Sequence, residues 1–213
     1  MAPSLLDSLT PESRALVLEL SRVRRVVAGE HLFHHGDEAD SMYVVESGRL
    51  AVRATTVDGD TAIVRVIGAG QVVGELALLV DGLRRTGSVV ALEPSMVRVI
   101  HRSQFAEIRA RDPRIDHALV SDLAARLASL SEQLLVSQFG TLAQRVVERL
   151  LVLDEVYRHG WIDVTQEALG AMTGGSRQAV NRVLADAAAT GLVAVRRGAV
   201  RVLDPAALAA RHR

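Results

Sequence analysis

The sequence predicts an α+β protein in which a β-roll, one long helix and a winged helix-turn-helix follow one another along the chain. Short β-type runs between glycine turns fill residues 24–100. A helical apolar repeat fills residues 115–138, and two helices with a tight turn precede a hairpin over residues 166–202. We therefore expect three parts, with boundaries at 1–114, 115–138 and 139–213.

The composition excludes several classes of protein. The chain has 213 residues, of which 49% are hydrophobic, so it can bury a substantial core. No apolar run approaches the ~18 residues of a membrane span, and the N-terminus lacks a basic-then-apolar signal. The absence of cysteine excludes disulfides, thiolate metal sites, cysteine-ligated clusters and cysteine nucleophiles. These features predict a cytoplasmic location and no membrane partner.

The net charge of zero conceals an asymmetry between the two parts of the chain. Residues 1–137 carry 15 arginines against 18 acidic residues, whereas residues 138–213 carry 10 arginines against 7 acidic residues. This division indicates an acidic sensing part and a basic binding part.

The N-terminal third predicts helices and then strands. Residues 4–22 predict one or two short helices, with Pro11 near a helix start and an apolar stripe of Leu5, Leu6, Leu9, Leu16, Val17 and Leu20. The expected β runs lie at residues 26–27, 42–45, 50–52, 62–67, 88–91 and 96–100, with a hairpin turn at 57–60. Several strands at this spacing predict a barrel or sandwich-like roll.

Three histidines in the roll, His31, His34 and His35, raise the question of a metal site. A metal-binding β-roll would use two histidines two residues apart, so that both point inward. His34 and His35 are adjacent and would face opposite sides of a strand. We therefore expect solvated histidines at a strand end and no metal.

A glycine-started turn inside the roll carries the residues best suited to a small ligand. Gly74, Glu75 and Leu76 are followed ten residues later by Arg85 and Thr86. A carboxylate accepts hydrogen bonds from ribose hydroxyls, while an arginine with a neighbouring hydroxyl can hold a phosphate. A cyclic nucleotide would satisfy both. The alternative for Glu75 and Arg85 is a plain surface ion pair.

The long helix carries a coiled-coil repeat. Its apolar positions follow 3-4-3-4 spacing at Val120, Leu123, Leu127, Leu130 and Leu134. Alternatively, the helix packs only on its own roll, and Ala124, Ala125 and Ala128 widen the apolar face accordingly. We expect a parallel homodimer through this seam.

The C-terminal part predicts a helix-turn-helix. Phe139-Gly140 is a hinge, residues 142–157 form a helix and residues 161–164 a short strand. In the motif itself, Gly170 lets two helices cross closely, Gly174 makes the turn, Ser176 caps the second helix, and Val180 and Val183 anchor that helix in the core.

The second helix of this motif presents polar side chains of the kind that read bases. They are Ser176, Arg177, Gln178, Asn181 and Arg182, at the N-terminal end of the helix and on its outer face. Arginine pairs with guanine, and glutamine or asparagine with adenine. A basic turn at Arg196 and Arg197 tips the following hairpin and suits phosphate contact. The alternative is a merely solvated polar face.

Over nearly its whole length the chain resembles the CRP/FNR family of bacterial transcription regulators. The segment from Gly74-Glu75-Leu76 to Arg85-Thr86 is similar to the phosphate-binding cassette of the cyclic-AMP receptor proteins, with the same carboxylate-to-arginine spacing. The run from Ser176 to Arg182 resembles their recognition helix. The resemblance implies a β-roll of the cyclic-nucleotide-binding type.

The resemblance assigns roles residue by residue. Glu75 would bind the ribose hydroxyl, Arg85 and Thr86 the cyclic phosphate, and Arg126 would lie near Glu75. Leu130 and Ser131 occupy the positions that face the adenine, Ser131 from across the dimer. Arg177, Gln178 and Arg182 would read the major groove.

Two residues depart from the family pattern. Leu130 stands where a threonine usually hydrogen-bonds the base, and we hypothesise that it biases the dimer toward its DNA-binding arrangement. Gln178 replaces the common glutamate, so the preference at one base of each half-site should differ. The absence of cysteine argues against an iron–sulfur oxygen sensor.

The sequence thus predicts a non-enzymatic, homodimeric regulator of transcription. Its effector would be cyclic AMP, and its partners palindromic double-stranded DNA and RNA polymerase. The alternative is a regulator of the same fold that needs no nucleotide or uses another small effector. A β-roll metalloenzyme would leave the C-terminal part unexplained, and a kinase-type regulatory subunit would not explain the helix-turn-helix.

Overall fold

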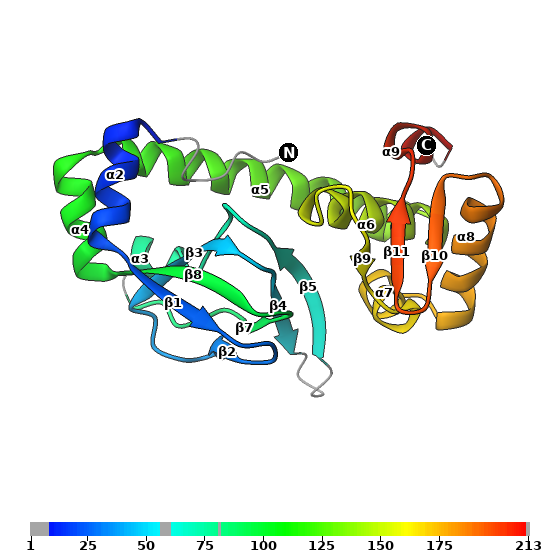
Figure 1. Ribbon diagram of the computed structural model, residues 1–213, viewed down its shortest axis with the longest axis horizontal. Coiled ribbons are helices and arrows are strands. Elements are labelled where there is room, and N and C mark those ends of the chain that lie inside the picture. The colour runs from blue at the N-terminus through cyan, green and yellow to red at the C-terminus, as the bar shows by residue number, and fades with distance from the viewer. Residues whose placement is uncertain (1–8, 56–60, 81, 212–213) are drawn as a thin grey trace. The chain divides into compact units, whose positions relative to one another are not determined.

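The computed structural model describes residues 9–55, 61–80 and 82–211. The chain forms two compact units, Met1–Arg126 and Leu127–Arg213 (Figure 1). The predicted hairpin turn at 57–60 and the first predicted helical residues, Leu5 and Leu6, lie outside the described residues.

The first unit is built on two four-stranded antiparallel sheets. One has the strand order β1-β8-β3-β6 and the other β2-β7-β4-β5. The strands of the first sheet are β1 (Arg22–Val26), β3 (Ser41–Ser47), β6 (Val72–Val73) and β8 (Ser95–His101). Those of the second are β2 (His31–Phe33), β4 (Leu50–Thr55), β5 (Thr61–Ile67) and β7 (Ser88–Ala91). The predicted roll is therefore confirmed.

The sheets and helices of this unit enclose two apolar clusters. One fills the space between the sheets and includes Leu50, Ile67 and Val97. The other joins the first sheet to helices α2 (Pro11–Leu20), α3 (Leu76–Leu79), α4 (Arg102–Arg111) and the start of α5 (Arg114–Phe139). Figure 1 shows α2 and α4 against the first turns of α5. This packing fixes the beginning of the long helix to the roll.

The helix starts in this unit follow local rules, although helix α4 was not predicted. Thr10 caps α2 through the N–H of Ser13, and Pro11 occupies its first turn, as expected. Helix α4 was missed because only Phe105 and Ile108 are buried in it, too few for a visible apolar repeat. Asp112 follows the last residue of α4 and accepts hydrogen bonds from Ser13 of α2 and Arg114 of α5. These bonds connect the end of α4 to both neighbouring helices.

The second unit contains the expected winged helix-turn-helix. Its elements are α6 (Leu142–Val156), β9 (Ile162–Asp163), α7 (Gln166–Thr173), α8 (Arg177–Ala189), β10 (Val193–Arg196), β11 (Ala199–Val202) and α9 (Pro205–Arg211). The strands form one sheet in the order β10-β11-β9. Helix α9 was not predicted from the sequence. No helix within the described ranges is long and apolar enough to cross a membrane.

Glycines set the turn between α7 and α8. Gly174 ends α7 in the left-handed conformation, with φ of 66°. A Cβ on Gly170 would lie 2.5 Å from the carbonyl oxygen of Gly175, so only glycine lets the turn fold back on α7. Ser176 then caps α8 by accepting from the N–H of Ala179 at 3.2 Å. The predicted roles of these three residues are confirmed.

We predict that the two glycines differ in how much they tolerate a methyl group. Gly170→Ala should lower the free energy of unfolding by about 2–3 kcal/mol, because the backbone must shift. Gly174→Ala meets no atom within 4 Å and should cost about 1 kcal/mol, for its positive φ alone. Urea unfolding followed by fluorescence of Trp161, the single tryptophan, measures both.

The control is Ala171→Ser, at an exposed position of the same helix, which should change stability by less than about 0.5 kcal/mol. If Gly170→Ala were as stable as this control, the close approach of the Gly175 carbonyl to Gly170 would be contradicted.

Candidate functional site

The carboxylate of Glu75 is held at the end of the roll by a cation from the long helix. Glu75 immediately precedes α3 and is only 5% exposed. Arg126 of α5 donates from Nη1 to Oε1 of Glu75 at 2.6 Å and from Nη2 to the carbonyl of Val72 at 3.1 Å. Asp122, one turn earlier on α5, pairs with the same guanidinium. The structure thus brings Glu75 and Arg126 together, as the resemblance implied.

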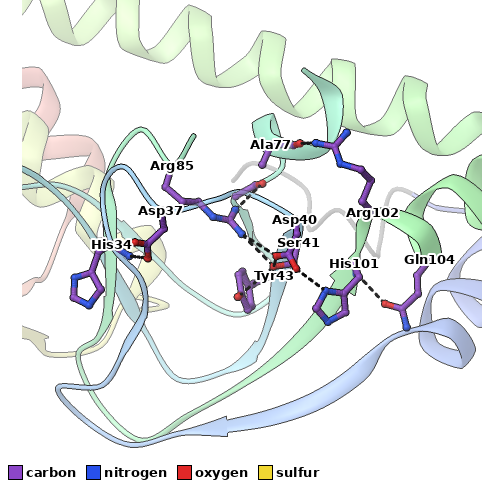
Figure 2. Close-up of polar contacts among 11 residues, drawn as sticks. His34, Asp37, Asp40, Ser41, Tyr43, Ala77, Arg85, His101, Arg102 and Gln104 are labelled. Atoms are coloured by element: carbon purple, nitrogen blue, oxygen red, sulfur yellow. Dashed lines mark hydrogen bonds and ion pairs between the residues drawn. The ribbon is translucent and has the colours of Figure 1, made fainter. Parts of the chain in front are cut away.

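The guanidinium of Arg85 is buried in the same unit and faces the turn that precedes Glu75. It donates to the carbonyl of Gly74 at 3.2 Å and to Oγ of Ser41 at 3.1 Å. It also stacks over the ring of Phe33, 4.2 Å from the centroid. Figure 2 shows Arg85 reaching toward Ser41 and Asp40. Arg85 is therefore ordered by the roll itself and does not pair with Glu75 as a simple surface bridge.

Gly74 is required for this arrangement. Its φ is +81°, and a Cβ there would lie 2.5 Å from Nη1 of Arg85. The glycine allows the backbone of the turn to approach the guanidinium closely, so that its carbonyl can accept. The motif Gly74-Glu75 thus aims two groups: a carbonyl at Arg85 and a carboxylate at Arg126.

A charged network extends from Arg85 across the neighbouring strands. Asp40 lies 4.0 Å from Nη2 of Arg85 and 3.4 Å from Nδ1 of His101. Partial burial raises the pKa of Asp40, but the hydrogen bond from Ser41 and the charge of His101 outweigh it, and the pKa lies below its usual value. Burial lowers the pKa of Arg85, while nearby acidic groups oppose that shift. Both groups keep their charge at neutral pH.

Two further predicted ligand residues lie on the surface of the first unit. Thr86 is exposed, and Leu76 is 39% exposed on the first turn of α3. Leu130 and Ser131 lie on the part of α5 that belongs to the second unit, where both are exposed. The hydroxyl of Ser131 donates to the carbonyl of Leu127 at 3.0 Å. The ligand roles of these four residues stay predictions.

Three residues of this region were not identified from the sequence. Ser41 and Phe33 hold Arg85 from strands β3 and β2, and no motif connects them to residue 85. Arg65 of β5 is acted on by the charges of Glu75, Asp122 and Arg126. The sequence does contain an indication for Arg65. It lies two residues from the apolar Ile63 and Ile67 in a predicted strand, so all three side chains are expected on the same face of that strand.

The second unit presents a polar face on α8. Val180, Leu184 and Ala187 are buried, and the opposite face carries the predicted base-reading residues Ser176, Arg177, Gln178, Asn181 and Arg182, all of which are exposed. Asn181 is partly engaged, since its Oδ1 accepts from Nε2 of Gln166 at 3.0 Å. An amphipathic helix with this exposed face is suited to enter the major groove.

The hairpin of β10 and β11 ends in the predicted basic turn. Arg196 and Arg197 are both exposed. The guanidinium of Arg196 lies over the ring of Trp161, 4.2 Å from its centroid, and 4.0 Å from Oδ1 of Asp163. Arg196, the last residue of β10, is thus oriented by Trp161 and Asp163, and Arg197 follows it in the turn of the hairpin.

Two of the three histidines singled out in the roll lie against each other. His31 and His34 stack with ring centroids 4.4 Å apart. Burial lowers the pKa of His31, and the charges of His34 and Arg53 lower it further. Within residues 9–55, 61–80 and 82–211 there is no cluster of three or more potential metal-ligating side chains.

The buried carboxylate and arginine in a β-roll, together with an exposed basic helix and wing, define the class of ligand-sensing transcription regulators. The family model of the cyclic nucleotide-binding domain matches residues 23–112, and that of the Crp-like helix-turn-helix domain matches residues 144–211. The chain belongs to the CRP/FNR family, whose members are transcription regulators rather than enzymes.

Relatives match nearly the whole chain. The cyclic AMP receptor protein of Thermus thermophilus is 30% identical over 204 residues, which cover 96% of this chain and 94% of that protein. A CRP-like cAMP-activated global transcriptional regulator of Mycobacterium tuberculosis is 29% identical, with 87% and 85% covered.

Solved structures agree on the fold. The Thermus thermophilus catabolite activator protein has a TM-score of 0.58 at 30% identity and covers 96% of both chains. The c-di-GMP responsive regulator CLP of Xanthomonas campestris has a TM-score of 0.75 over 92% of this chain and all of its own. At 24% identity, the likeness to CLP shows the fold alone.

We predict that Arg126→Gln destabilises the protein by about 2–3 kcal/mol, because it leaves the buried Glu75 carboxylate without its cation. The double variant Glu75→Gln/Arg126→Gln should be more stable than Arg126→Gln, since the buried charge is gone. Urea unfolding followed by far-UV circular dichroism, analysed as a double-mutant cycle, measures the coupling.

The matched control is Arg109→Gln. It breaks the exposed pair of Arg109 with Asp116, whose side chains are 48% and 37% exposed, and should cost at most about 1 kcal/mol. A double variant less stable than Arg126→Gln would show that the charge of Glu75 is satisfied without Arg126.

Proposed function

We propose that this chain is a homodimeric, DNA-binding transcription regulator whose DNA affinity is controlled allosterically by a cyclic nucleotide. One observation carries the proposal: a carboxylate, Glu75, and a guanidinium, Arg85, are both buried in the roll, and the turn residue Gly74 that precedes Glu75 contacts Arg85. Cyclic AMP, which the names of several relatives contain, is the first effector to test.

The two buried groups match the two polar ends of a cyclic nucleotide. The carboxylate of Glu75 would accept from the ribose 2′-hydroxyl, and Arg85 would hold the cyclic phosphate by charge-assisted hydrogen bonds. Thr86 supplies a hydroxyl beside the same phosphate. Phe33 and Ser41 already hold the side chain of Arg85 in place, so little side-chain entropy would be lost when Arg85 binds the phosphate.

The contact of Arg126 with Glu75 supports a route from the ligand to the long helix. A ribose hydroxyl and Arg126 would both approach the carboxylate of Glu75, so binding changes the environment of a residue on α5. Helix α5 carries the predicted dimer seam, and the hinge at Phe139-Gly140 connects it to the DNA-binding unit. The ligand would shift the equilibrium between two states of the dimer. The size of that shift is set by the difference in the ligand's affinity for the two states.

The apolar stripe of α5 supports dimerisation. Its seam residues Val120, Leu127, Leu130 and Leu134 are 57–67% exposed, and Leu123 is half-buried. Such a row of leucines on one helix is the signature of a coiled-coil partner surface. A parallel dimer would present two copies of α8 to successive major grooves of a palindrome, about 34 Å apart. RNA polymerase would be a further partner.

The alternative is a regulator that binds DNA without a nucleotide or responds to another small effector. Leu130 favours this alternative, because leucine cannot hydrogen-bond a base and extends the apolar seam. In that case the dimer would already occupy its DNA-binding state.

We predict that cyclic AMP tightens binding of the protein to a palindromic duplex at least tenfold, about 1.4 kcal/mol of coupling. Fluorescence anisotropy of the labelled duplex, at one fixed salt concentration, measures it. Arg85→Leu should abolish the effect of the nucleotide while leaving the DNA-binding unit intact, and Arg182→Ala should weaken DNA binding itself. Tight binding that ignores the nucleotide would instead support the alternative and the role given to Leu130.

We predict that the wild-type chain sediments as a dimer and that Leu127→Glu/Leu134→Glu sediments as a monomer, because two carboxylates would be placed in an apolar seam. Val27→Glu is the matched control, since Val27 is 66% exposed and lies in the roll, outside the seam. Sedimentation velocity distinguishes the states, and a monomeric wild type would contradict the proposed seam.

A further inference from the structure

The side chain of Arg65 points into the roll. On the paired strands β4 and β5, Leu50 lies opposite Ile67 and Val52 lies opposite Arg65. Leu50 and Ile67 belong to the cluster between the sheets, and Val52 packs against it. Residues two apart in a strand face the same side, so Arg65 shares the inner face with Ile67. An arginine here occupies a position that the core would give to an apolar residue.

The fold itself makes little use of this arginine. Burial and the charge of Arg126 lower the pKa of Arg65 to about 10, against the opposing charges of Glu75 and Asp122. Both carboxylates already pair with Arg126. Among the residues the structure describes, none makes a hydrogen bond or ion pair with the Arg65 side chain. As far as the described part of the chain goes, its donors remain available to a ligand.

The charge of Glu75 acts on both Arg65 and Arg85. The charges that act on Arg65 are those of Arg126, Glu75 and Asp122. Those that act on Arg85 are the charges of Tyr43, Asp40, Asp37 and Glu75. Glu75 is common to both sets, and each guanidinium has its own further neighbours. Arg65 is thus near the carboxylate that Arg126 holds, whereas Arg85 is fixed near Ser41 and Asp40.

We propose that Arg65 reads the base of the bound nucleotide and gives the pocket a preference for guanine over adenine. This inference rests on the proposed cyclic-nucleotide function. In a cyclic nucleotide, the ribose carbon with the free hydroxyl lies between the carbon that bears the phosphate ester and the carbon that bears the base. With that hydroxyl on Glu75 and the phosphate on Arg85, the base would lie on the far side of Glu75 from Arg85, inside the roll, where the inner face of β5 carries Arg65.

The chemistry of the two purines decides the preference. Guanine presents two acceptors, O6 and N7, which match the fork of a guanidinium. Adenine presents N7 beside the N6 amino group, a donor that opposes the donors of arginine. A guanidinium beside the bound base therefore favours guanine, and Arg65 acts as the specificity-determining residue.

Isothermal titration of the full-length protein with cyclic GMP, cyclic AMP and cyclic IMP tests this. We expect cyclic GMP to bind at least tenfold more tightly than cyclic AMP, and cyclic IMP, which keeps O6 and N7, to bind within threefold of cyclic GMP. Arg65→Met should weaken cyclic GMP and cyclic IMP at least tenfold and change cyclic AMP less than threefold. Arg109→Met, which removes an exposed cation of the same unit, should change none of the three.

The ligand can also be altered in place of the protein, which keeps the test independent of how the variants fold. Binding of 7-deaza-cyclic GMP, which lacks the N7 acceptor, should be at least tenfold weaker than that of cyclic GMP to the wild type. Arg65→Lys keeps the charge but loses the fork, and should behave like Arg65→Met. Full retention of the guanine preference in Arg65→Lys, or in the 7-deaza nucleotide, would overturn the two-acceptor contact.

The failures of the two proposals give different results. A wild type that binds cyclic AMP more tightly than cyclic GMP would overturn the role of Arg65 and leave the proposed function standing. Equal weakening of both nucleotides by Arg65→Met would do the same, because the arginine would then act only through its charge. No binding of any of the three nucleotides would overturn the proposed function together with this inference.

Discussion

The ion pair between Arg126 and Glu75 is the interaction on which the sensing part of the structure depends. It joins a residue of the long helix to the turn that begins α3, and both side chains are largely buried. A buried pair contributes little net stability, because the lost hydration of the two charges offsets their attraction. Removing one partner is costly, however, so the pair strongly specifies how α5 meets the roll. A ligand that competed with Arg126 for the carboxylate of Glu75 would therefore directly affect how α5 meets the roll.

Much of this arrangement could be predicted from the sequence, because local rules govern it. Gly170, Gly174 and Ser176 fulfil backbone requirements that the residue types reveal, and the exposed apolar stripe of α5 follows from its spacing. Helices α4 and α9 were missed because their buried residues are too few to show a period. Ser41 and Phe33 could not be assigned to Arg85, since their contact comes from the pairing of strands distant in sequence.

The DNA-binding unit and the roll differ in how they place their arginine side chains. In the roll, the buried guanidinium groups of Arg85 and Arg126 are paired or hydrogen-bonded, so each of the two has a fixed orientation. On α8 and the wing, the arginines are exposed and can adapt to a duplex, with Arg196 alone oriented by a ring. Buried charges suit selection among small ligands, and exposed charges suit the salt-dependent binding of a polyanion.

The charges near Glu75 also bear on which effector the chain would recognise. In the proposed function, Glu75 and Arg85 would contact parts that all cyclic mononucleotides share, namely the ribose hydroxyl and the phosphate, so these two residues would not distinguish one base from another. Discrimination requires a polar group that meets the base edge, because mismatched donors and acceptors are costly once buried. Arg65 is such a group, and the roll retains it at a position where an apolar side chain would pack without a desolvation cost. Its presence there is accounted for by a ligand more readily than by the fold.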